Sequence, residues 1–171
     1  QVVELLKKGM AQPKGTILTL FYANQLKDIP YVAATLEVNP EEHLAINLTQ
    51  LDCATLVDNA LALSLTTCRS KSTKFSDFCY WLKRIRYRNG ELDGYASRNH
   101  YFTQWVNSNE KMGIVAEVTG EKANNYSPFI ASKKLDLHYM TMHPNSYPLL
   151  KKEKANGTSA KANSQSSLIK Q

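Results

Sequence analysis

The sequence predicts an α+β fold, in which a buried helix is followed by short strands. Residues 54–65 are apolar nearly all round, and only Asp58 and Asn59 strongly interrupt the pattern. A helix of this kind is typical of the centre of a domain. Residues 113–118 and 135–142 have the apolar or alternating character of strands. We therefore expect the central helix to pack on an antiparallel sheet.

The elements before the central helix are short. Residues 15–24 are predicted to form a helix, and Pro30 then forces an extended or turn conformation on the residue before it. The Asn-Pro-Glu-Glu sequence of residues 39–42 predicts a turn, and residues 44–48 predict a short strand that leads to Asp52.

A second helix is predicted over residues 74–85, followed by a turn at Asn89-Gly90. Its apolar residues recur at the spacing of one helix face: Phe75, Phe78, Cys79, Leu82 and Ile85. From residue 151 onward the chain consists mainly of Lys, Asn, Ser, Ala and Gly, which is typical of a flexible linker or tail. The sequence thus predicts one domain over residues 1–150 and a polar tail over residues 151–171.

Composition excludes some classes of protein. No run approaches the ~18 consecutive apolar residues of a membrane span. None of the cysteines forms a Cys-x-x-Cys pair, which argues against a structural zinc site. The net charge of +6 favours anionic surroundings such as cell-wall polymers, lipid headgroups or nucleic acid. A few surplus lysines, partly in the tail, explain the charge equally well.

The cysteine at the start of the central helix is the most informative residue. Cys53 follows Asp52 where an irregular segment becomes helical. A helix N-terminus offers unsatisfied N–H groups and the positive end of the helix dipole, and both favour a thiolate. Cys53 is therefore a candidate nucleophile, and Asp52 is a candidate cap that binds a backbone N–H at the helix start.

Two segments, Ile29-Pro30-Tyr31-Val32 and Leu51 to Val57, resemble the NlpC/P60 superfamily of papain-like cysteine hydrolases. Other motifs resemble one branch of it, the DUF1460 family, which is N-acetylmuramoyl-L-alanine amidase-like. They are Ala33 to Glu37, Asn47-Leu48, Ile85 to Gly90, Asp93-Gly94-Tyr95, Arg98 to Phe102 and Met142-His143-Pro144. The resemblance implies a papain-like NlpC/P60 fold and hydrolysis of the amide between N-acetylmuramic acid and the L-alanine of the peptidoglycan stem.

The resemblance also implies the surroundings of the reaction. We expect a peptidoglycan or muropeptide substrate, a periplasmic or secreted location, no nucleic acid and no transmembrane segment. Neither a cofactor nor a metal is expected, because the thiolate attacks the carbonyl directly. The sequence does not determine the oligomeric state.

Several residues are candidates for binding the substrate. Tyr31 either donates its hydroxyl to the oxyanion or is an ordinary half-buried tyrosine. Glu37 forms either an ion pair or a peptide contact. Arg88 and Arg98 either bind a carboxylate or are solvated or salt-bridged. Three aromatic residues are candidates for stacking on a sugar, although core packing is favoured for the last of them: Tyr95, Tyr101 and Trp105.

The histidine that acts as the base is the part of this mechanism that the sequence does not identify. In the family we expect it near a Ser-His-Val-Gly-like stretch, and none occurs here. The domain is therefore expected to be truncated at its C-terminus, with the base beyond residue 171. If the base lies within the chain, His100 is the first candidate and His138 the second. The alternatives are a γ-D-glutamyl endopeptidase, or a non-catalytic muropeptide-binding module if the base is absent.

Overall fold

The protein was analysed as a computed structural model, in which residues 1–116, 130–134, 149 and 166–170 are described. The chain divides into two compact units, Gln1–Arg86 and Tyr87–Gln171. Each unit has its own internal packing.

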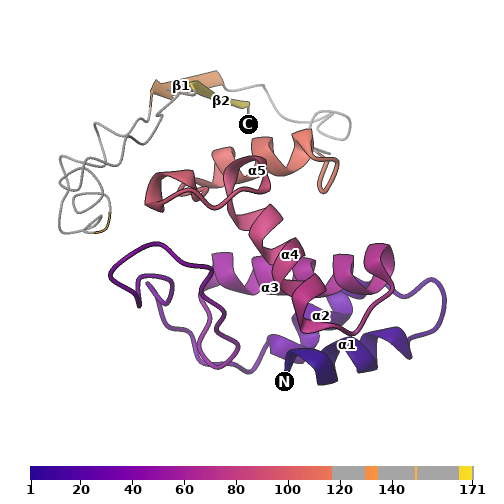
Figure 1. The fold of residues 1–171 in the computed structure, drawn as a ribbon. Coiled ribbons are helices and arrows are strands. Elements are labelled where there is room, and N and C mark those ends of the chain that lie inside the picture. The colour runs from indigo at the N-terminus through magenta and orange to yellow at the C-terminus, as the bar shows by residue number, and fades with distance from the viewer. Residues whose placement is uncertain (117–129, 135–148, 150–165, 171) are drawn as a thin grey trace. The chain divides into compact units, whose positions relative to one another are not determined.

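The first unit is built from helices (Figure 1). They are α1 (Val2–Met10), α2 (Leu18–Leu26), α3 (Cys53–Leu65), the π-helical turn η1 (Thr66–Ser70) and α4 (Phe75–Arg86). Helix α3 contacts α1, α2 and α4 and is therefore central. The fully buried side chains at these contacts include Leu6, Tyr22, Leu63, Phe78 and Leu82.

The predicted α+β, papain-like fold, with the nucleophile helix on an antiparallel sheet, is wrong. In the described part of the chain, strands occur only as β1 (Ile130–Lys134) and β2 (Ser166–Lys170), which pair antiparallel with each other. Helix α3 packs on helices instead. The physical reason is that the apolar faces of α1, α2 and α4 already cover α3, and they provide the burial that a sheet would otherwise supply.

The strand predictions over residues 44–48 and over 113–116, the described part of the segment 113–118, are also wrong. Residues 44–48 form a loop, in which the carbonyl of Ala45 accepts a hydrogen bond from Arg86 and that of Asn47 accepts one from Asn59. Side chains thus satisfy carbonyls that a neighbouring strand would have bound. Residues 113–116 continue the C-terminal turn of a helix, where Gly113 adopts a φ of +64°. Residues 117–118 and 135–142 lie outside the described residues, as does the predicted tail apart from β2.

The helix predictions are confirmed within a few residues. Helices α2, α3 and α4 correspond to the predicted segments 15–24, 54–65 and 74–85. Helix α1 was not predicted, although its buried residues recur at helical spacing: Val2, Leu5, Leu6 and Gly9. A Cβ at Gly9 would lie 1.8 Å from the Tyr22 hydroxyl, so glycine allows α1 to approach α2 closely.

The second unit begins with two 3₁₀ turns, η2 (Arg88–Gly90) and η3 (Tyr95–Ser97), and continues into α5 (Phe102–Lys111). The predicted turn at Asn89-Gly90 is confirmed, because both residues have positive φ, 55° and 75°. An isolated antiparallel bridge joins Tyr87 to Arg98. This bridge closes the segment between them into a compact loop.

A buried ion pair connects the helices of the first unit. The Nε of Arg86 donates to the Asp58 carboxylate at 2.9 Å, and both side chains are almost fully buried, with 4% and 6% exposed. The same guanidinium donates through Nη1 to the carbonyl of Ala45. One side chain on α4 therefore connects α3 to the loop that leads to Cys53.

Replacing Asp58 by Ala should leave the Arg86 guanidinium buried without its carboxylate. We expect the free energy of unfolding to fall by about 3–5 kcal/mol, measured by urea denaturation followed by circular dichroism. The matched control is Glu4→Ala, which removes the exposed Glu4–Lys7 pair and should cost less than about 0.5 kcal/mol. Equal small losses in both variants would contradict the role given to the buried pair.

Candidate active site

The thiol of Cys53 is exposed at the first residue of α3. A reciprocal capping box fixes the start of this helix. The Asp52 carboxylate accepts from the backbone N–H of Thr55 at 2.8 Å, and the Thr55 hydroxyl oxygen accepts from the N–H of Asp52 at 2.8 Å. The predicted capping role of Asp52 is confirmed. Its carboxylate is engaged by the first turn of the helix, and this geometry holds Cys53 at a defined helix end.

The backbone of the Pro30-Tyr31-Val32 segment is hydrogen-bonded to Leu51, which lies two residues before Cys53. The N–H of Val32 donates to the carbonyl of Leu51 at 3.0 Å, and the N–H of Leu51 donates to the carbonyl of Pro30 at 3.1 Å. Tyr31 thereby forms a parallel bridge with Leu51, two residues before Cys53, while its side chain is 72% exposed. The backbone thus brings together the two motifs that are separate in the sequence.

The first turn of α3 also presents hydrogen-bond donors. The N–H groups at the start of a helix have no partner within it. The N–H groups of Cys53 and Ala54 donate to no acceptor among the described residues. Such donors, together with the positive end of the helix dipole, can stabilise an oxyanion that forms next to the thiol.

Two residues of α3 that the sequence analysis did not assign to the site support it. Thr55 completes the capping box, and its signal was the Asp-x-x-Thr spacing. The Nδ2 of Asn59 donates to the carbonyl of Thr55 at 2.8 Å and to that of Asn47 at 3.4 Å. Asn59 is buried and therefore fixes the preceding loop to α3. The feature of the sequence that could have identified Asn59 is that it is a polar residue within an apolar helix.

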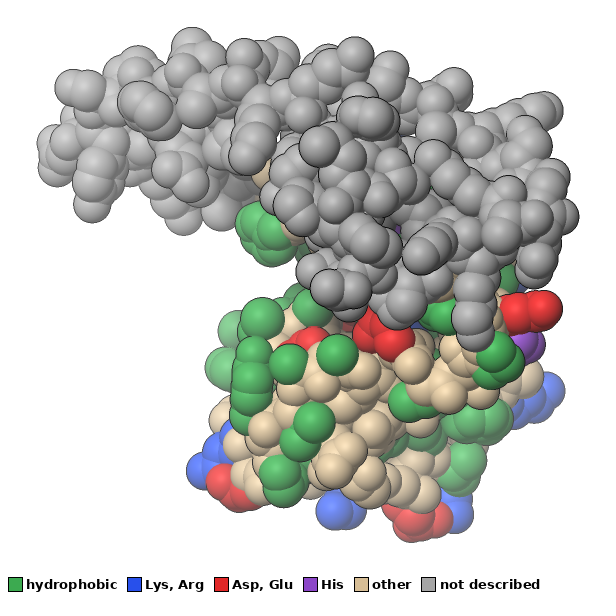
Figure 2. Space-filling view, turned by 90° about the vertical axis from the view of Figure 1, so that its left-hand side faces the viewer, with side chains coloured by type: hydrophobic (Ala, Val, Ile, Leu, Met, Phe, Trp, Pro, Cys, Tyr) green, Lys and Arg blue, Asp and Glu red, His purple; other side chains and the backbone are tan. Residues whose placement is uncertain are grey.

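The exposed surface of the first unit also carries apolar side chains. Tyr31, Val38 and Val57 are among the large hydrophobic residues at the surface, and Figure 2 shows such residues on one face of the described part. Val57 lies one helical turn after Cys53, so its side chain is on the same face of α3. The surroundings of the thiol are therefore partly apolar.

A separate cluster forms in the second unit. The Nε2–H of His100 donates to the carbonyl of Tyr95 at 2.8 Å, and the two ring centroids are 4.4 Å apart. The Arg98 guanidinium lies 4.7 Å from the centroid of the Tyr95 ring. Tyr95 and Arg98 are buried, with 1% and 5% exposed. These residues pack on one another rather than projecting from the surface.

Burial lowers the pKa of His100 to about 4. The positive charges of Arg98 and Arg88 act in the same direction, and the hydrogen bond to Tyr95 opposes them. The imidazole is therefore neutral at neutral pH, with its proton on Nε2.

The remaining residues that were predicted to bind the substrate are partly or fully engaged within the fold. Arg88 donates through Nη2 to the carbonyl of Ala96. Tyr101 and Trp105 are half-buried at the start of α5, and Glu37 is half-buried in the loop after Pro30. The structure thus pairs the backbone of Tyr31 with Leu51, two residues before Cys53, in the first unit. In the second unit it brings Arg88, Tyr95, Arg98 and His100 together.

The sequence matches a family model described as AmiA-like, N-acetylmuramoyl-L-alanine amidase-like, over residues 22–166. The chain belongs to this family. No curated protein matches it.

Solved structures resemble this AmiA-like chain. One is an N-acetylmuramoyl-L-alanine amidase from Bacteroides uniformis, with 32% identity and a TM-score of 0.65, covering 94% of this chain and 63% of that one. Another, from Bacteroides fragilis and named as a candidate xylanase, has 37% identity and a TM-score of 0.64, covering 88% and 64%. A DUF1460 protein from Legionella pneumophila, LPG0564, has 18% identity and a TM-score of 0.71, covering 99% and 60%, and shows likeness of fold alone.

The AmiA-like chain thus spans about 60–64% of the length of these three relatives. Within the described residues, no group of three or more His, Cys, Asp or Glu side chains is arranged to hold a metal ion. The helices of the described residues are all too short or too polar to cross a membrane.

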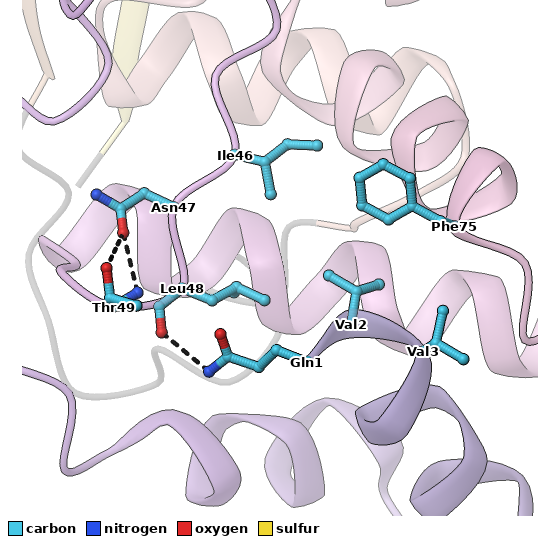
Figure 3. Close-up of a pocket in the computed structure, with 8 residues that line it drawn as sticks. All are labelled: Gln1, Val2, Val3, Ile46, Asn47, Leu48, Thr49 and Phe75. Carbon is cyan, nitrogen blue, oxygen red and sulfur yellow. Dashed lines mark hydrogen bonds between the residues drawn. The ribbon is translucent and has the colours of Figure 1, made fainter.

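The first unit also contains a hollow of about 370 Å³ (Figure 3). It is lined by Gln1, Val2, Val3, Ile46, Asn47, Leu48, Thr49 and Phe75. The Asn47 side-chain oxygen accepts from both the N–H and the hydroxyl of Thr49. The hollow therefore borders the loop that Asn59 and Arg86 hold, and it contains none of the predicted catalytic residues.

The stability of the AmiA-like chain should depend on His100 in mild acid. Its folded pKa of about 4 is below the ordinary value near 6.5, so the unfolded chain binds the proton first. The contribution of His100 to the free energy of unfolding is therefore complete above about pH 6.5. It is lost as the pH falls toward about 4, and the loss is up to about 3 kcal/mol. Urea denaturation of the protein and of His100→Gln across this range measures the effect. Parallel pH profiles for the two proteins would contradict it.

Proposed function

We propose that this chain supplies the nucleophile of a cysteine-dependent N-acetylmuramoyl-L-alanine amidase. The observation that carries the proposal is the exposed Cys53 thiol at a capped helix start, with the Pro30–Val32 segment paired to Leu51. Membership of the AmiA-like family and the likeness to an amidase from Bacteroides uniformis support it.

The proposed reaction proceeds through a thioester. The Cys53 thiolate attacks the lactyl carbonyl carbon, and the oxygen becomes an oxyanion held by the Cys53 N–H and the Tyr31 hydroxyl. The C–N bond then breaks, and a protonated histidine gives its proton to the leaving nitrogen of L-alanine. Water, deprotonated by the same histidine, hydrolyses the thioester and releases the thiolate and a lactyl carboxylate.

The source of the histidine decides whether these 171 residues suffice for catalysis. His100 is the candidate among the described residues, but it is neutral and donates its Nε2–H to a backbone carbonyl. If His100 is the base, it must accept the proton through its other ring nitrogen, Nδ1. His138 and His143 lie outside the described residues. The proposal therefore assigns the nucleophile to Cys53 and leaves the base to His100 or to a histidine outside the described part.

The proposed substrate is peptidoglycan or a muropeptide, and the proposed location is the periplasm or the exterior of a bacterial cell. Arg88, Arg98 and Glu37 are proposed to orient the stem peptide. Tyr95, Tyr101 and Trp105 are proposed to line the sugar side of the site. The burial of Tyr95 and Arg98 means that they would contact substrate only after the cluster opens, and otherwise they act by supporting His100.

Alkylation by iodoacetamide should identify Cys53 as the activated thiol. Cys68 is a matched internal control, because it is also exposed but lies in η1, at the opposite end of the α3 helix. The N–H donors at the start of α3 lie beside Cys53 and not beside Cys68, so we expect Cys53 to react about two- to tenfold faster at neutral pH. Peptide mass spectrometry of timed samples measures both rates. Equal rates would refute the activation of Cys53.

Mass spectrometry of digested peptidoglycan should define the bond that is cut. An amidase releases stem peptides with a free N-terminal L-alanine, and Cys53→Ala should abolish this release. Cys79→Ala is the matched control, because Cys79 lies on α4, outside the site. Products cut within the stem peptide would instead show a γ-D-glutamyl endopeptidase. Binding of intact muropeptide without any product would show a non-catalytic binding module.

A further inference from the structure

Cationic and aromatic side chains form a continuous stack on α4 and η1. The Arg69 guanidinium lies 5.6 Å from the centroid of the Trp81 ring, and the Arg84 guanidinium lies 5.6 Å from the centroid of the Tyr80 ring. The two rings meet edge to face, with centroids 5.2 Å apart. We call Arg69, Trp81, Tyr80 and Arg84 the cation–aromatic stack.

The stack is held in a defined arrangement at the surface. The Nε1–H of Trp81 donates to the Ser70 hydroxyl oxygen at 2.8 Å, which joins α4 to η1. Tyr80 is 49% exposed, and the apolar residues of α4 point the other way: Phe78, Leu82 and Ile85 are buried. A helix repeat of 3.6 residues places positions 80 and 84 opposite that buried face. The Tyr80 ring therefore lies outside the core of the first unit, and the Trp81 ring is half-buried at the edge of that core.

Positive charge surrounds the stack. Lys71, Lys74 and Lys83 add three cations on the same two elements and their connection. Asp77 is the single acidic residue between positions 66 and 86, and it lies one helical turn before Tyr80 and Trp81 on the same face of α4. Guanidinium groups bind carboxylates through paired hydrogen bonds. The flat aromatic rings offer apolar faces on which the C–H faces of a sugar ring can pack. The combination suits a polymer that carries both sugar rings and carboxylates.

We propose that the cation–aromatic stack binds an anionic glycan strand of the cell wall, at a distance from the scissile bond. This inference rests on the proposed amidase function. Hydrolysis of the muramoyl amide adds water across the C–N bond, so that the amine leaves with the peptide and a lactyl carboxylate stays on the glycan. Every cleavage therefore creates the negative charge that the guanidinium groups of the stack recognise, and the protein is retained on strands that it has processed.

The buried apolar face of α4 argues for a glycan rather than a membrane. A helix that binds a bilayer inserts its apolar face among the acyl chains. In α4 the residues that would insert, Phe78, Leu82 and Ile85, have 0% exposure. Aromatic stacking with flanking arginines can also bind nucleic acid, so the affinity for single-stranded DNA is measured in the same test.

Binding of denuded glycan strands to the full chain tests the proposal. The strands are prepared with a separate muramoyl amidase, so the measurement does not depend on catalysis by this protein. We expect binding that weakens with added salt, and about five- to tenfold weaker binding by Tyr80→Ala and by the double variant Arg69→Gln/Arg84→Gln. Isothermal titration calorimetry measures the affinities. Circular dichroism checks that the variants are folded.

Two matched variants serve as controls. Lys7→Ala/Lys8→Ala removes two exposed cations of α1, and Phe75→Ala removes an exposed ring of α4 outside the stack. Both should bind strands as the parent does. Neutral chitooligosaccharide should bind more weakly than denuded strands. Equal affinity of the stack variants and the parent would overturn the inference, as would tighter binding to phosphatidylglycerol vesicles or to single-stranded DNA. Failure of peptidoglycan digestion alone would refute the proposed function and not this binding site.

Discussion

The buried pair of Arg86 and Asp58 is the interaction on which the first unit depends. Arg86 ends α4, Asp58 lies in the middle of α3, and the carbonyl of Ala45 in the preceding loop accepts from the same guanidinium. A charge removed from water is costly unless it is fully paired. The three elements therefore have one arrangement in which this guanidinium is satisfied, and the capped start of α3 with its cysteine is fixed within that arrangement.

Local sequence signals predicted helices α2, α3 and α4, including the start of α3. The Asp52 cap, the apolar run that follows it and the Asn89-Gly90 pair each act over a few residues, and the structure follows them. The strand over residues 44–48 was predicted wrongly because this segment looks like a strand, although Arg86 and Asn59 bind its carbonyls from distant positions. Such long-range partners leave no signal in the segment itself, and the short-range pattern is the same for a strand and for an extended loop.

The candidate site shows the same division between local and long-range information. The motif resemblance associated Tyr31 with Cys53, and the backbone pairing of Tyr31 with Leu51 explains that association physically. By contrast, the sequence could place Tyr95, Arg98 and His100 together only as neighbours along the chain. They stack on one another within the loop that the bridge between Tyr87 and Arg98 closes. A list of polar and aromatic residues cannot show whether they face a ligand or one another.

The π-helical turn η1 has a consequence for how the surface of the first unit could have changed over time. A π turn is closed by i→i+5 hydrogen bonds, so it accommodates one residue more than an α turn does. Removing one residue from Thr66–Ser70 would restore α geometry and rotate the residues beyond it by about 100° relative to α3. Arg69 and Ser70 would then no longer be held against Trp81. The gain or loss of one residue in η1 is thus enough to form or disrupt the contacts of Arg69 and Ser70 with Trp81, while the sequence of the buried helices stays the same.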